Sequence, residues 1–343
     1  MEGPNLSMAK QKLHHLWKAM AENAVRFLIS LTFITVFQLL FGTQNILAGV
    51  AIGVGFTTLP GMPLGIRPIP MAAMTVGLYL GGSILGQTAL LSPWLAFLLN
   101  FLFVLLLMLL SGEPLDMKPY ISFILCFLFC QATPVPWPEL PRRMLGAAAA
   151  GIFVAAATLL AWRKKGYDKE GRTLKQQILL GKTNSGYFLR MAAGIALAMA
   201  TGMFLELKKP LWISIVTMSL TQMDFKDTVQ RIKHRSIATL LGLIMFFVLF
   251  QLIIPPQFAY IGILALGYLS YFTPEYKHKQ IVNAISAINA SLVILDTTTA
   301  FENRVFCLIG GILIVLLLCL IQKLVTKFRS ATEPMPLLNG DSC

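Results

Sequence analysis

The stretch PWLAFLLNFLFVLLLMLLS, residues 93–111, decides the fold class of this chain. It carries no charge, and about 20 apolar residues in a helix cross a hydrocarbon core of about 30 Å. Apolar runs of similar length fill most of the sequence, and breaks rich in proline, glycine and charge separate them. Of 343 residues, 56% are hydrophobic and only 13% are charged, whereas an ordinary soluble domain has about 25% charged residues. We therefore expect an all-α integral membrane protein.

The apolar runs predict about twelve transmembrane helices. They lie at 25–41, 45–59, 70–87, 93–111, 118–135, 144–162, 187–205, 210–223, 236–254, 258–273, 281–295 and 305–325. This division gives a first six-helix half at 25–162 and a second six-helix half at 187–327, joined by a cytoplasmic linker at 163–186. A basic interfacial segment, 1–24, precedes the first half, and a cytoplasmic tail, 328–343, follows the second.

The two halves resemble copies of each other. A shift of the sequence by 164 residues without gaps superimposes most breaks of the first half on breaks of the second, and it aligns Arg26 with Arg190 and Arg67 with Arg231. Because each half has an even number of spans, we expect two parallel repeats related by an axis along the membrane normal. Transporters and channels commonly have such repeats.

The charged residues lie between the apolar runs or at their ends. The chain has 28 basic and 15 acidic residues and a net charge of +13. With the N-terminus in the cytoplasm, 23 basic residues fall inside and 5 fall outside, the latter being Arg142, Arg143, Lys208, Lys209 and Arg304. Cytoplasmic loops of membrane proteins carry such an excess. We therefore expect both termini in the cytoplasm and no binding of nucleic acid.

Several kinds of chemistry find no support in the sequence. Cys126 and Cys130 lie one helical turn apart inside an apolar run, where thiols without a nearby His or acid behave as small hydrophobic side chains. No span contains paired acids, a histidine cluster or a nucleophile with a base, and no Gly-x-x-x-x-Gly-Lys-Ser/Thr motif is present. We therefore expect neither an enzyme nor a bound metal or cofactor.

Two spans at matching places of the two halves are unusually short, 45–59 and 210–223. Short or glycine- and proline-interrupted segments at such places are the best sequence indication of a transport site, because backbone exposed at that depth has to line a cavity. Tilted or partly re-entrant structural helices would give the same pattern. The sequence leaves both interpretations open.

The segment after the second short span holds most candidate site residues. Thr228, Arg231 and Arg235 lie at the helical spacing i, i+3 and i+7. If the helix continues, Thr239 and Gly242 share the same face, and the glycine marks a place where another helix can approach closely. We expect this face to point into the helix bundle.

Three titratable residues, Asp224, Asp227 and His234, are neighbours of these arginines. Acids, histidine and arginine at the cytoplasmic mouth of a bundle would collect an anionic substrate and relay a proton. A solvated loop that follows the positive-inside rule and forms salt bridges is the alternative. Lys226 and Lys233 do not lie on the inward face, so we expect them to play no part in transport.

Other polar residues extend the candidate pathway. Asn283 and Asn289 lie along the eleventh span, where they either line the pathway or bond neighbouring helices. Arg304 is expected at the outer mouth, and Arg231 and Arg235 at the inner mouth. Basic groups at both mouths favour an anionic solute, because they raise its local concentration.

The same region resembles a known family. Lys209-Pro210-Leu211-Trp212, then the short span, then Gln222-x-Asp224-Phe225-x-x-Thr228-x-x-Arg231-x-x-x-Arg235-x-x-x-Thr239-x-x-Gly242, is similar to the signature of the fusaric acid resistance and aromatic acid exporter superfamily. Met223 and Ala238 replace the proline and glycine usual in that signature. The layout of two six-helix halves resembles a compact bacterial branch of the superfamily, which is related in fold to the plant malate-channel family.

The resemblance implies a bacterial inner-membrane secondary transporter that exports small aromatic or other organic acids with the proton gradient. It also implies a periplasmic membrane-fusion adaptor as a partner, beside the lipid bilayer and a small anionic substrate. A passive organic-anion channel of the same fold and a non-transporting membrane assembly partner are the alternatives. The sequence leaves a homo-oligomer open.

Overall fold

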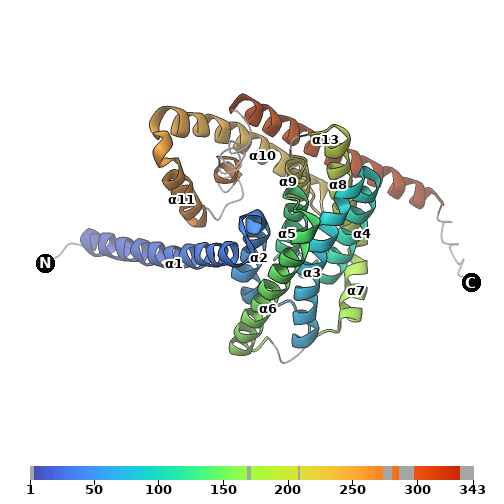
Figure 1. Ribbon diagram of the computed structural model, residues 1–343, viewed down its shortest axis with the longest axis horizontal. Helices are drawn as coiled ribbons and strands as arrows, with labels where there is room; N and C mark the ends of the chain where they lie inside the picture. The colour runs from blue at the N-terminus through green and yellow to red at the C-terminus, as the bar shows by residue number, and fades with distance from the viewer. Residues whose placement is uncertain (1–3, 168–170, 208, 273–279, 286–296, 333–343) are drawn as a thin grey trace, which may run out of the picture.

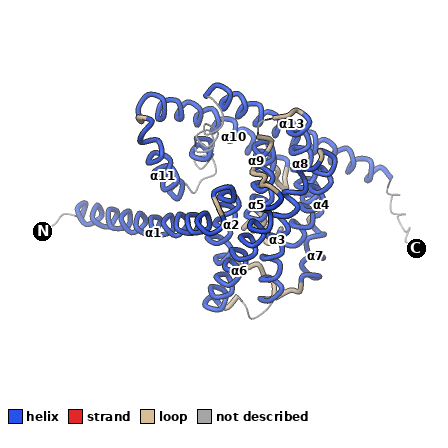
Figure 2. Tube along the Cα trace, in the orientation of Figure 1, coloured by secondary structure: helices blue, strands red, loops and turns tan. Residues whose placement is uncertain are grey.

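A computed structural model describes residues 4–167, 171–207, 209–272, 280–285 and 297–332. This part of the chain consists of helices joined by short loops (Figure 2). One isolated parallel bridge, between Ile66 and Arg172, is the only β pairing among the residues described. The expected all-α class is confirmed.

The helices follow the order of the predicted apolar runs. The first part of the chain forms α1 (Pro4–Phe41), α2 (Ile46–Thr58), α3 (Pro68–Thr88), α4 (Pro93–Ser111), α5 (Ile121–Ala132) and α6 (Leu140–Lys165). The later part forms α7 (Leu174–Thr183), α8 (Ser185–Phe204), α9 (Leu211–Leu220), α10 (Phe225–Phe246), α11 (Ala259–Leu269) and α13 (Thr297–Thr332). Residues 280–285 are also helical, and a π-helical segment, Phe247–Ile253, continues α10.

The helix ends follow local residue chemistry. At the start of α4 the Ser92 side chain accepts a hydrogen bond from the Leu95 amide (3.2 Å), and Pro93 takes the first helical position. Gly166 ends α6 in the left-handed conformation (φ 72°), which costs glycine little. Thr173 then begins α7 with a capping box, so part of the predicted linker is a helix.

Seven described helical segments are long and apolar enough to cross a membrane, by length and composition. They are Trp17–Phe41, Pro68–Leu91, Pro93–Ser111, Trp137–Lys165, Ser185–Phe204, Phe225–Ile253 and Phe301–Val325. The chain is thus a multi-pass membrane protein, and the count of twelve spans stays a prediction. The boundary predicted after residue 24 falls inside α1, which continues without a break.

The first half and α8 form a dense bundle, whereas the helices beyond α8 are spread out. In Figure 1, α1 extends away from the bundle, and α10 and α11 arch over the same side. One continuous apolar core connects α2 to α6 with α8, and Ile52, Phe127 and Phe188 are fully buried in it. Leu211 and Met218 of α9 join this core, and most other buried apolar residues described beyond α8 fall into three small clusters.

The loops of the first half gather at two ends of this bundle. At one end the Arg67 amide donates to the Arg172 carbonyl (3.0 Å), which joins the α2–α3 loop to the α6–α7 loop. At the other end Gln87 Nε2 donates to the Val135 carbonyl (2.9 Å), which joins α3 to the α5–α6 loop. The first pair belongs to loops expected in the cytoplasm, and the second pair lies at the end expected outside.

One predicted loop residue is instead part of the buried bundle. Arg143 was expected in an outer break but lies in the first turn of α6 and is only 1% exposed. Its guanidinium donates to the side chains of Asn45 (2.7 Å) and Gln87 (3.4 Å) and to three backbone carbonyls. Convergence of these acceptors allows the charge to be buried without a carboxylate.

Candidate functional site

A cavity of about 620 Å³ lies between the first half and the second half. Helices α2, α5, α9, α10 and α13, the α4–α5 and α9–α10 loops and the helical residues 280–285 contribute to it. The lining residues are Val50, Val54, Lys118, Tyr120, Ile121, Leu125, Phe129, Trp212, Ile215, Met218, Ser219, Gln222, Arg231, Arg235, Gln280, Asn283 and Arg304.

The polar part of this cavity is cationic. Lys118, Arg231, Arg235 and Arg304 contribute four basic side chains, and the lining residues among those described include no Asp or Glu. Several like charges around one space repel each other, and an anion between them relieves that repulsion. The cavity therefore suits an anionic ligand.

The break between α9 and α10 determines where two arginines point. The ten-residue α9 ends inside the protein, so its last carbonyl groups need hydrogen-bond partners. Arg190 Nη2 donates to the carbonyls of Gln222 (2.9 Å) and Met223 (2.7 Å), and Arg231 Nη1 lies 3.5 Å from the Ser219 carbonyl oxygen. Cations at a helix C-terminus are favourable. Arg231 therefore has a structural role beside its place in the cavity wall.

Arg235 connects three elements around the cavity. It is 4% exposed, and its Nη1 donates to Ser219 Oγ and to Gln280 Oε1 (2.9 Å). The helical residues 280–285 approach α10 closely because Gly242 has no side chain. A Cβ there would lie 2.5 Å from Ala284 Cβ. The sequence-based prediction for this glycine is confirmed.

Arg304 differs from the other arginines of the cavity. Its guanidinium carbon lies 4.5 Å from the centre of the Trp212 ring, a cation–π contact. Arg304 is 6% exposed, and its Nη1 has no hydrogen-bond partner. Trp212 Nε1 is also buried without a partner. Two residues that line the cavity therefore each have a buried donor atom without a hydrogen-bond partner.

Lys118 lies on the loop between α4 and α5, outside both helices. It adopts a left-handed backbone conformation (φ 52°), which is uncommon for a residue with a side chain. Its Nζ donates to Gln222 Oε1 (3.1 Å), which joins this loop to the α9–α10 break. Burial and the nearby charge of Arg231 lower the pKa of Lys118 to about 8, while Asp227 acts in the opposite direction.

The predicted inward face of α10 agrees with the structure. Thr228 and Thr239 are buried beside Arg235 on α10, and Lys226 and Lys233 are exposed. Neither threonine is among the residues that line the cavity. Thr228 Oγ1 instead donates to the Asp224 carbonyl at the start of the helix (3.1 Å).

The three titratable neighbours do not line the cavity. The side chains of Asp224 and Asp227 are exposed, His234 is half-buried on α10, and none of the three is among the lining residues. Asp224 precedes α10 but makes no side-chain capping bond. The structure therefore does not bring these groups together with the arginines as a proton relay inside the cavity.

Arg304 lies elsewhere than the sequence suggested. It was expected at the outer mouth, apart from Arg231 and Arg235, yet all three line one cavity. Asn283 also contributes to the lining, and Asn289 lies outside the described residues. Arg304 thus shares one site between the halves with Arg231 and Arg235. Lys209, the other described residue expected at the outer mouth, does not line this cavity.

Several cavity residues were not predicted as site residues, namely Lys118, Tyr120, Trp212, Ser219, Gln222 and Gln280. Trp212 and Gln222 belong to the family-like motif and were quoted only as part of it. Lys118 was interpreted only as a topology-determining charge. For Gln222, the signal available in the sequence was its place in the predicted short span 210–223. Lys118, at the start of the predicted span 118–135, had no such signal.

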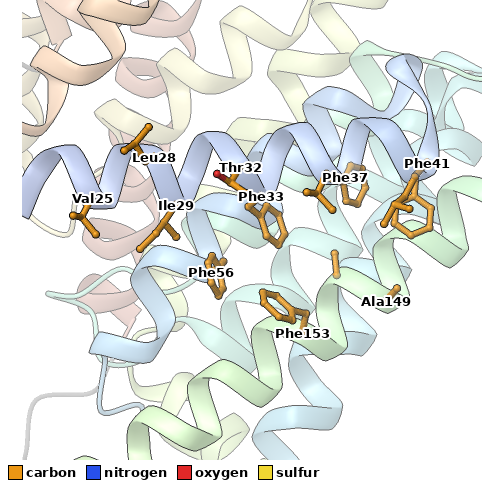
Figure 3. Close-up of a pocket in the computed structure, with 13 residues that line it drawn as sticks. Val25, Leu28, Ile29, Thr32, Phe33, Phe37, Phe41, Phe56, Ala149 and Phe153 are labelled. Carbon is orange, nitrogen blue, oxygen red and sulfur yellow. The ribbon is translucent and has the colours of Figure 1, made fainter.

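A second cavity, of about 610 Å³, lies between α1, α2 and α6. Figure 3 shows Phe33 and Phe37 of α1 near Phe56 of α2 and Phe153 of α6. Among its lining residues only Thr32 has a polar side chain, and none is charged. This groove suits hydrocarbon and offers no group that would recognise an anion.

The comparison with family profiles gives one match. Residues 195–318, from α8 to α13, match the family described as Fusaric acid resistance protein-like. A search of curated proteins gives no match, and a search of solved structures gives none either. The matched region contains Trp212, Arg231, Arg235 and Arg304 of the cavity. The chain therefore carries a fusaric acid resistance protein-like domain at residues 195–318.

Proposed function

We propose that this chain is a secondary transporter that exports small organic anions, aromatic acids among them, with the proton gradient as driving force. The observation that carries the proposal is the cavity between the halves, where four basic residues gather and the described lining has no carboxylate. Positive potential between low-dielectric walls raises the local concentration of an anion. The family match and the seven apolar helices support a membrane transporter and not an enzyme.

The short helices support a transport site at this position. At about 1.5 Å per residue the ten residues of α9 extend about 15 Å, roughly half of a hydrocarbon core. Both α9 and α2, which correspond to the two predicted short spans, line the cavity. Helices α8, α9 and α13 contact one another, as do α1, α2 and α6. This correspondence supports the proposed pair of parallel six-helix repeats.

The proposed topology has both termini in the cytoplasm of a bacterium and the chain in its inner membrane. It rests on the basic residues, 23 inside and 5 outside, and agrees with the way the loops gather at two ends of the bundle. Glu139→Cys, alone in a cysteine-free chain, should react with an impermeant maleimide in intact cells, whereas Ser185→Cys in the same background should react only after the cells are opened. Reaction of both from one side would contradict the scheme.

Flux into and out of proteoliposomes tests the proposed activity. Purified protein should move radiolabelled benzoate against its concentration gradient when a pH gradient is imposed. Flux that only dissipates the benzoate gradient would identify a passive anion channel. No flux of benzoate, salicylate or malate would support a membrane assembly partner without transport of its own. Protein-free vesicles correct for diffusion of the neutral acids.

The passive channel is the second candidate, and one observation favours it. Acids and histidine are the groups that most often carry protons in transporters, and neither is found among the described cavity residues. The periplasmic adaptor rests on the family resemblance alone. Copurification of an adaptor with the tagged chain from its native cells tests that partner.

A further inference from the structure

Arg304 and Trp212 both line the cavity, and each has one unsatisfied donor atom, Arg304 Nη1 and Trp212 Nε1. Both atoms are buried, and neither has a hydrogen-bond partner. They lie on different helices, α13 and α9, and the guanidinium carbon is 4.5 Å from the indole ring centre. Buried donors are nearly always paired, so two adjacent unpaired ones indicate a missing acceptor.

The surroundings restrict what this acceptor is. Arg235 and Arg304 line the same cavity without a carboxylate among the described lining residues, so a negative charge is favoured there. A carboxylate has two oxygen atoms that accept hydrogen bonds in one plane, and it can therefore satisfy two donors at once. Indole and guanidinium groups donate but cannot accept, so a neutral donor group would leave both unsatisfied.

The remaining walls restrict the rest of the ligand. Apolar side chains surround the polar groups, namely Val50, Val54, Ile121, Leu125, Phe129, Ile215 and Met218. These apolar walls favour a ligand with an apolar body. An anion with one charged head and an apolar body fits this arrangement better than inorganic phosphate.

We propose that Trp212 Nε1 and Arg304 Nη1 together bind the oxyanion head of the transported solute, and that Trp212 is a specificity-determining residue of this cavity. The inference rests on the proposed function, since it assigns a head-group subsite within the same anion site. Arg304 supplies the charge, and the indole N–H supplies the second hydrogen bond. The cation–π contact holds the guanidinium beside the indole ring.

Binding of radiolabelled benzoate to the full-length protein in zwitterionic nanodiscs tests the subsite. Trp212→Phe keeps an aromatic ring and loses only the N–H, so we expect about tenfold weaker binding. Arg304→Gln should weaken binding about a hundredfold. Trp137→Phe, at an exposed tryptophan outside the cavity, should bind as wild type does. Benzyl alcohol should not compete.

A double-mutant cycle separates a shared head-group contact from a general structural effect. If both residues hold the same head, Trp212→Phe should cost little more once Arg304→Gln is present. If Trp212→Phe binds benzoate as tightly as the wild type does, the proposed subsite is wrong. Competition by inorganic phosphate as strong as that by unlabelled benzoate would contradict it too. Additive losses accompanied by a lower unfolding temperature would also overturn it.

Two further outcomes separate the subsite from its alternatives. An anionic lipid head has the same oxyanion chemistry, so binding is repeated in nanodiscs with phosphatidylglycerol. The site would be a lipid site if benzoate binding is lost in these nanodiscs and if native mass spectrometry shows that the wild type retains the lipid whereas Arg304→Gln does not. A wild-type chain that carries other organic anions but binds no benzoate overturns the subsite alone, whereas absence of all flux overturns the proposed function.

Discussion

The two halves of the chain each bury an arginine near the start of their last helix, and they use it in opposite ways. Arg143 on α6 donates to five acceptors inside a continuous apolar core. Arg304 on α13 stacks on Trp212 at a cavity wall and leaves Nη1 without a partner. The difference teaches that burial alone does not mark a functional charge. Arg304 is the one that lines a cavity and also has an unsatisfied donor.

The largest expected effect comes from removal of the satisfied arginine. Arg143→Gln leaves several buried acceptors without donors, and we expect a loss of about 3–5 kcal/mol in stability and poor recovery of folded protein. The unfolding midpoint in detergent, followed by size-exclusion fluorescence, measures this loss. Arg142→Gln is the matched control, since Arg142 is exposed and donates only to the Leu40 carbonyl (3.2 Å).

The same measurement on Arg304→Gln could break the comparison. Its guanidinium has an unsatisfied nitrogen and shares the cavity with Arg235, so its removal should change stability by less than about 1 kcal/mol. A destabilisation as large as that of Arg143→Gln would mean that both arginines are structural.

The contrast between the halves also shows what the sequence could and could not predict. The inward face of α10 follows from helical spacing, and the apolar runs account for the helices. The cavity depends on contacts between residues far apart in sequence, such as Lys118 with Gln222, and no periodic pattern reveals them. In the sequence, Arg143 next to Arg142 indicates an outer loop. The five acceptors of Arg143 come from α3, from α5 and from the segments before α2 and after α5, and no local pattern predicts that they meet.

The next largest effect is expected for transport. Arg235→Gln removes a charge and the donors to Ser219 and Gln280, so benzoate flux should fall at least tenfold, in line with about 1.5–3 kcal/mol for a charged hydrogen bond. Lys233→Gln is the control, because Lys233 is exposed on the opposite side of α10. Equal losses in both variants, at equal membrane insertion, would mean that only the summed charge matters.

A smaller effect tests whether the second half holds together through one close helix contact. Gly242→Ala sets a Cβ 2.5 Å from Ala284 Cβ, and we expect about 1–2 kcal/mol of destabilisation from the overpacking. Gly77→Ala, in the first half, meets no atom within 4 Å and should stabilise α3 by up to about 1 kcal/mol. Destabilisation by both substitutions would indicate a general intolerance of alanine and not a specific contact.

The smallest effect concerns Lys118, where the loop of the first half meets the break of the second. Its pKa is lowered to about 8 by burial and by Arg231, and Asp227 raises it. Below that pH the protonated side chain attracts an anion into the cavity, and above it the charge is lost.

At a constant pH gradient, flux should therefore fall about two- to fivefold as the pH on the Lys118 side rises from 7 to 9. Lys118→Arg, whose guanidinium stays charged over this pH range, should remove this decline, and Lys118→Gln should give the lower flux at every pH. Asp227→Asn should move the midpoint to lower pH, because the carboxylate that favours the protonated lysine is gone. An unchanged pH profile in all three variants would exclude Lys118 from the transport site.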